Sequence, residues 1–103
     1  MHLYIGVRLR RVAPEQWEVT APDLPECRTT GRSSGEALAR ARLALEGLIA
    51  ARLGREEPLP QPRSRDQLLA EDPTGVEYFE VHINLRHLRA LARHQAGRWQ
   101  AGA

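Results

Sequence analysis

A long helix is the feature of this sequence that most constrains its fold. The segment Ser33-Ser34-Gly35-Glu36 has the pattern of a capping box, in which a serine and a glutamate satisfy the free N–H groups that begin a helix. Apolar residues then recur at helical spacing, namely Leu38, Ala41, Leu45, Leu48, Ile49 and Leu53. Gly54 and the prolines after it are typical of a helix end. The spacing predicts a helix over residues 34–53, which must find an apolar surface elsewhere in the chain.

Alternating apolar and polar residues predict that surface. Alternation with period 2 is typical of a half-buried strand, and it occurs three times before the helix and once after it. The predicted strands cover about residues 3–10, 17–21, 27–30 and 79–85. Prolines at 22 and 25 cannot donate to a strand ladder, so they separate the second strand from the third.

The element order β-β-β-α-β predicts an α+β domain. Three strands joined by short turns form a meander, and a fourth strand reached across a helix is expected to run parallel to the first. We expect the sheet order 3-2-1-4, with the helix packed on the face that carries Leu3, Ile5, Val7 and Leu9. The other face is polar and the prediction leaves it uncovered. A core of this size is small, so we expect a homo-dimer or higher oligomer.

The sequence after the long helix predicts a connection and a boundary between two parts of the chain at residue 83. Residues 55–75 form a connection punctuated by prolines, in which Ser64-Arg65-Asp66-Gln67 is a second capping box. Residues 1–83 are predicted to form the main domain, and residues 84–103 a short basic helix and a tail. Along that helix an apolar stripe is the expected oligomerisation surface, made of Leu85, Leu88 and Leu91.

Charge is distributed unevenly along the 103 residues. All 15 basic residues are arginine, and the net charge is +2. Residues 55–83 carry three arginines against seven acids, whereas residues 84–103 carry four arginines and no acid. The basic segment is compatible with weak binding of nucleic acid through its phosphates. The candidate residues for this contact are Arg86, Arg89 and Arg93. Cations near the C-terminal end of a helix also complement its dipole, so these arginines can be explained without a bound ligand.

Several classes of function are excluded or disfavoured. Cys27 is the single cysteine, so an internal disulfide is excluded, and its place in the alternation predicts a small buried side chain. No acid occurs in residues 2–12, which argues against a two-metal nuclease, and we expect no enzyme activity and no cofactor. Three of the four histidines, His82, His87 and His94, are expected to be solvated. No window has the roughly 20 apolar residues of a membrane span and no signal peptide is recognised, so we expect no membrane association and a cytoplasmic protein.

One ordered set of segments resembles HicB-type antitoxins. Residues 17–27 (WEVTAPDLPEC) resemble that family's aromatic strand and Pro-Asp-Leu-Pro-Gly-Cys turn, and residues 31–53 resemble its glycine and alanine-rich helix. Leu59-Pro60-Gln61-Pro62 is similar to its Ile-Pro-x-Pro exit, and residues 78–83 lie where its last strand is expected. Glu26 departs from the family's glycine, which is costly if that turn needs a positive φ.

The resemblance implies a fold and a partner. It implies an incomplete ribonuclease-H-like domain that binds and neutralises a HicA-type toxin, a small mRNA-cleaving protein. Acidic side chains of this chain would compete with RNA for the basic surface of such a toxin. The candidate partner-binding residues are Glu18, Glu77 and Glu80. Many members carry a C-terminal DNA-binding domain, which the segment after residue 83 is too short to form. The alternatives are a nucleic-acid-binding transcriptional regulator and an orphan homo-oligomeric domain.

Overall fold

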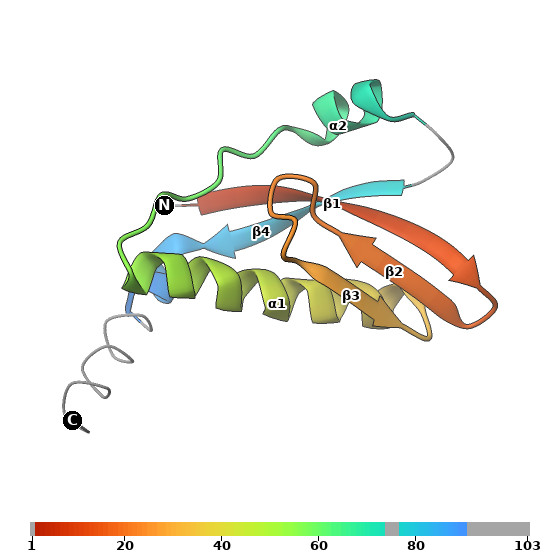
Figure 1. Ribbon diagram of the computed structural model, residues 1–103, viewed down its shortest axis with the longest axis horizontal. Helices are drawn as coiled ribbons and strands as arrows, with labels where there is room; N and C mark the ends of the chain where they lie inside the picture. The colour runs from red at the N-terminus through yellow and green to blue at the C-terminus, as the bar shows by residue number, and fades with distance from the viewer. Residues whose placement is uncertain (1, 74–76, 91–103) are drawn as a thin grey trace.

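The first strand of the sheet organises the domain (Figure 1). A computed structural model describes residues 2–73 and 77–90. Strand β1 (His2–Ala13) pairs with β2 (Gln16–Thr20) on one side and with β4 (Glu77–Asn84) on the other, and β3 (Arg28–Gly31) lies beyond β2. The sheet order β3-β2-β1-β4 and the α+β class confirm the prediction from the sequence.

The direction of β4 is the main departure from the predicted topology. β4 runs antiparallel to β1, with Leu3 opposite Ile83 and Val7 opposite Phe79, whereas a parallel strand was expected. Helix α1 (Ser34–Gly54) returns the chain toward the start of β1, and residues 55–71 then run back along the sheet (Figure 1). Prolines at 58, 60 and 62 favour an extended path for this return. The chain therefore enters β4 from the opposite end.

The ends of α1 show how its sequence fixes its limits. The Ser33 hydroxyl accepts a hydrogen bond from the Glu36 N–H at 3.1 Å, as the capping pattern predicts, whereas the Glu36 carboxylate pairs with Arg40 at 2.9 Å. At the C-terminal end the left-handed residue is Glu56, with φ 55°, and not Gly54. Backbone N–H groups of Glu56 and Glu57 donate to carbonyls of the last turn, which closes the helix.

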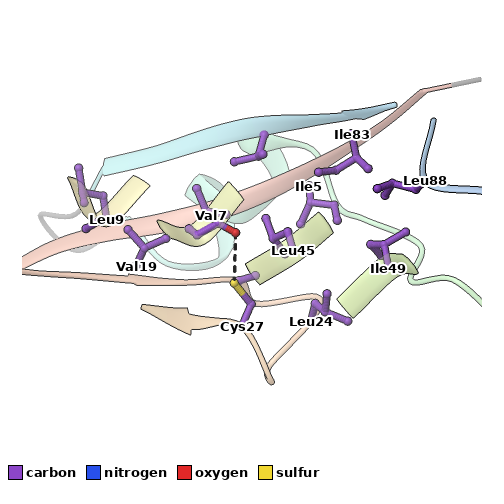
Figure 2. Close-up of a cluster of buried hydrophobic side chains, with 14 of the residues drawn as sticks. Ile5, Val7, Leu9, Val19, Leu24, Cys27, Leu45, Ile49, Ile83 and Leu88 are labelled. Carbon is purple, nitrogen blue, oxygen red and sulfur yellow. Dashed lines mark hydrogen bonds between the residues drawn. The ribbon is translucent and has the colours of Figure 1, made fainter. Parts of the chain in front are cut away.

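The core lies between α1 and one face of the sheet. Figure 2 shows Ile5, Val7 and Leu9 of β1 on the same side as Leu45 and Ile49 of α1. Cys27 is part of this cluster, 1% exposed, with its Sγ 3.9 Å from the Ala41 carbonyl oxygen. Period-2 alternation along β1 therefore predicted the buried set correctly.

Gly31 allows the start of α1 to lie directly on β3. A Cβ at Gly31 would lie 2.6 Å from the Ala37 nitrogen and 3.0 Å from its Cα, both backbone atoms that cannot rotate away. The Thr29 hydroxyl donates to the Ala37 carbonyl oxygen at 3.0 Å beside this contact. A residue without a side chain is required here for close approach of the two backbones.

The second face of the sheet is partly covered, contrary to the prediction that nothing would cover it. Helix α2 (Arg65–Glu71) begins with the predicted capping box, and its Leu68 is 3% exposed over Gly6 of β1. Asp23 holds the returning chain in place, because it accepts from the Arg63 backbone N–H at 2.7 Å and from its Nε at 2.8 Å. The loop after β2 and the return segment are thus joined across 40 residues of sequence.

The chain after β4 continues the same core. Residues 85–90 are helical, and Leu85 and Leu88 are 5% and 2% exposed within the core cluster. These two leucines of the predicted oligomerisation stripe are therefore buried inside one chain, and Leu91 lies outside the described residues. Within the ranges 2–73 and 77–90, no helix is long and apolar enough to cross a membrane.

The contact at Gly31 predicts a specific stability effect. Gly31→Ala should lower the free energy of unfolding by about 1–3 kcal/mol, because the new methyl group meets backbone rather than flexible side chains. Gly47→Ala is the matched control, since nothing lies within 4 Å of a Cβ there and alanine favours a helix by roughly 0.5–1 kcal/mol. Urea denaturation measures both, and a Gly31→Ala variant as stable as the parent would contradict the close packing.

Candidate protein-binding surface

The outer edge of β4 and the adjacent helix α2 enclose a hollow of about 510 Å³. Two of the predicted partner-binding acids, Glu77 and Glu80, line this hollow and are exposed. Its remaining lining is Arg65 and Leu69 of α2 with Tyr78 and Phe79 of β4. Glu77 and Glu80 thus line one hollow at the edge of the sheet, next to the apolar side chains of Leu69 and Phe79.

Two apolar side chains at this edge are unexpectedly exposed. Phe79 is 39% exposed, although the alternation of β4 assigned it to the core, because α1 packs mainly against β2 and β3 and leaves this end of β4 open. Leu69 is 38% exposed, since its neighbour Leu68 takes the inward position of α2. Sequence reasoning missed Phe79 because it could not show how far α1 extends over the sheet, and it missed Leu69 because it could not show which side of α2 packs inward.

The backbone of β4 faces outward beside these side chains. Arg65 Nε donates to the Tyr78 carbonyl oxygen at 2.7 Å, and Arg42 Nη2 donates to the His82 carbonyl oxygen at 3.2 Å. These carbonyls point away from β1, and strand groups alternate in direction with period 2, so the backbone of Glu80 between them also points outward. We call the outward backbone groups of Tyr78, Glu80 and His82 the β4 edge.

Glu18, the third predicted partner-binding residue, lies elsewhere. It belongs to β2, two strands away from β4, and its carboxylate is bound by Arg28 at 2.7 Å and by Arg10 at 3.3 Å. These hydrogen bonds and charges, the bond to Arg28 first, hold the pKa of Glu18 below its ordinary value of 4.5. The Glu18 side chain is 14% exposed, so its charge is used within the sheet rather than offered to a partner.

The rings of His2, Tyr4 and His82 meet on the open part of the second sheet face. His82 Nε2 lies 2.6 Å from His2 Nδ1, and the His82 ring stacks on Tyr4. In the loop after β2, Asp23 is paired with Arg63 and Glu26 with Arg52. Among the described residues, no group of three or more His, Cys, Asp or Glu side chains gathers where it could hold a metal ion. His94 lies outside the described residues.

The single thiol is placed as a core residue. Burial raises the pKa of the Cys27 thiol, which keeps it protonated and unreactive at neutral pH. Its hydroxyl-bearing neighbour Thr29 is engaged with the Ala37 carbonyl. The prediction of a small buried cysteine is therefore confirmed by its position.

The basic C-terminal segment is described only in part. Arg86 and Arg89 are exposed on the helical turn that follows β4, and Arg93 lies outside the described residues. The turn at Glu26 does not use a positive φ, since the non-glycine residues with positive φ in the described chain are Glu15 and Glu56. The turn tolerates glutamate there without backbone strain.

Comparison with solved structures identifies this architecture. The N-terminal domain of the antitoxin HicB from Burkholderia pseudomallei superposes with a TM-score of 0.70, over 80% of this chain and 99% of that domain, at 19% sequence identity. The fold is that of the HicB N-terminal domain. The longer crystal structure of the same antitoxin gives a TM-score of 0.75 over 84% of this chain, also at 19% identity.

The amino-acid sequence of this chain is much less similar to known proteins than its fold is. No protein-family model and no curated protein matches it. This chain spans 65% of the longer HicB chain. The likeness to HicB is thus a likeness of fold, and it covers the sheet and helices that hold the candidate surface.

The ion pairs of Glu18 predict a pH dependence of stability. Because the pKa of Glu18 is lowered in the folded protein, its contribution is fully present above its ordinary value of 4.5 and is lost as the pH falls through the lowered value. Glu18→Gln should cost about 1–2 kcal/mol at pH 7 and markedly less at pH 3. Urea denaturation at both pH values measures this, with Glu15→Gln as the control that changes neither by more than about 0.5 kcal/mol. An equal cost at both pH values would contradict the account.

Proposed function

We propose that this chain is an antitoxin-like protein that binds and neutralises a HicA-type, mRNA-cleaving toxin by covering its RNA-binding and catalytic surface. The observation that carries the proposal is the HicB fold, which extends over four-fifths of the chain. An RNA-cleaving partner must attract phosphates and is therefore basic, so an acidic edge with Glu77 and Glu80 is complementary to it. We place the protein in the cytoplasm, where such a toxin meets mRNA.

The proposed role is inhibition by binding and not catalysis. Glu18 on β2 is engaged with two arginines, and Asp23 in the loop after β2 is engaged with Arg63. A two-metal nuclease needs several carboxylates that converge on the ions, and the described residues hold no such group. No cofactor is required for a protein that acts by covering a surface.

The proposed division at residue 83 is one of role rather than of packing. Residues 1–83 form the toxin-binding part, and the basic segment 84–103 adds arginines while Leu85 and Leu88 anchor its start in the core. We also propose a homo-dimer or higher oligomer, which requires a surface other than these two buried leucines. The alternative functions are a nucleic-acid-binding regulator and an orphan homo-oligomeric domain.

Neutralisation is tested with the toxin itself. We expect the reading frame beside this chain's gene to encode a basic protein of roughly 60–80 residues. That protein should cleave a model mRNA in vitro, and the full chain should stop the cleavage at about one chain per toxin because it occupies the catalytic surface. The chain alone, with or without Mg²⁺ and Mn²⁺, serves as the control and should leave the RNA intact. Full cleavage at a tenfold excess of the chain would contradict the proposal.

DNA binding separates this function from the regulator. Fluorescence anisotropy at about 150 mM salt should show weak binding to the native promoter, equal to that of a scrambled duplex and steeply reduced by added salt. Arg86→Gln with Arg89→Gln should weaken it further, because both side chains are exposed. Promoter binding about 1,000-fold tighter than binding to the scramble would instead establish the regulator.

A further inference from the structure

The two edges of this sheet differ in length and charge. β4 offers eight residues, with Glu77 and Glu80 along it, whereas β3 at the other edge offers four. The β3 edge carries no acid, and Arg40 donates to the outward carbonyl of Thr30 at 2.9 Å. Of the two edge strands, β4 is therefore the one that offers carboxylates of its own to an added strand.

Arginines from both faces cover the carbonyls of the β4 edge. Arg65 reaches Tyr78 from the α2 face, and Arg42 reaches His82 from α1 on the other face. Unpaired edges invite pairing with other chains, and proteins commonly blunt them with charged side chains. These two hydrogen bonds involve flexible, exposed side chains that a partner's N–H groups can replace, and Glu80 between them has no such cover in the described structure.

We propose that the β4 edge is the docking site of the toxin, and that an extended basic segment of the toxin adds to the sheet beside β4 as a fifth strand. This rests on the proposed function and assigns its contact surface. The backbone of Tyr78, Glu80 and His82 supplies the hydrogen bonds, as in other cases of strand addition. Alternate side chains of the added strand cover Phe79 on the α1 face and Leu69 on the α2 face, and its basic residues pair with Glu77 and Glu80.

A second copy of this chain fits the β4 edge less well. Antiparallel pairing of two β4 strands about Glu80 would bring two glutamates opposite each other, about 5.5 Å apart at Cα, which is destabilising for like charges. Pairing of β4 with the β3 edge of another copy would use only four residues, and Arg28 and Arg40 there already hold Glu18 and Glu36. A basic protein partner is the better match in charge and length.

Proline variants test the edge without altering the pairing inside the sheet. Glu80→Pro removes an N–H that points away from β1, and proline is tolerated at such edge positions. Its matched control is Thr30→Pro, which removes an outward N–H from the β3 edge. Isothermal titration of the full chain uses a catalytically inactive variant of the neighbouring HicA-type toxin. We expect Glu80→Pro to weaken binding at least tenfold and Thr30→Pro to change it less than threefold.

Charge reversal provides a second variant that keeps every backbone donor. Glu77→Arg with Glu80→Arg should weaken binding at least tenfold, whereas Glu15→Arg with Glu57→Arg changes the net charge equally and should have less than threefold effect. Circular dichroism confirms that each variant is folded. The docking site is overturned if the parent chain binds and neither β4 variant weakens it, or if Thr30→Pro is the variant that does.

Self-association is distinguished in the same preparation. Sedimentation of the parent chain without toxin, compared with Glu80→Pro, shows whether the β4 edge joins two copies of this chain. A parent assembly that Glu80→Pro dissociates would overturn the proposal in favour of a second copy. A parent chain that does not bind the toxin at all would instead contradict the proposed function, which makes the two failures distinguishable.

Discussion

The alternation of side chains along β1 is the constraint on which the domain depends. Ile5, Val7 and Leu9 face α1 and are almost fully buried, so the helix must lie across that face. Gly6, between two of them, faces the other side and leaves the space that Leu68 fills. Because β1 pairs with strands on both sides and is covered by α1 on one face and in part by α2 on the other, four elements are placed directly against it.

The elements and their order were predictable from local signals. The capping serines, the helical spacing and the period-2 strands depend on neighbouring residues, so the sequence alone determines them. The direction of β4 could not be predicted in this way, because it depends on the path that residues 55–71 take along the sheet. That path is held by Asp23, which binds the Arg63 backbone and side chain 40 residues later. A single pairing of this kind leaves no periodic trace in a sequence.

The candidate surface was predictable only in part for the same reason. Glu77 and Glu80 stood out by charge, and the structure places both at the β4 edge. Glu18 has the same chemistry, yet its carboxylate is paired with Arg10 and Arg28 on the neighbouring strands. This pairing depends on the register of the strands. Phe79 follows the apolar alternation but lies beyond the reach of α1, so it is exposed. Residue type predicted which side chains suit a partner, and packing decided which remain available.

The proposed role, a domain that binds its partner through the open edge beside Glu77 and Glu80, unites these features. Amide hydrogen exchange of the full chain, alone and with the catalytically inactive toxin, tests it most directly because it requires no variant. The account predicts that exchange at Tyr78, Glu80 and His82 slows at least tenfold in the complex, while Thr30 on the β3 edge is unchanged. Protection confined to the β3 edge, or a complex in which the three β4 amides exchange as fast as in the free chain, would contradict it.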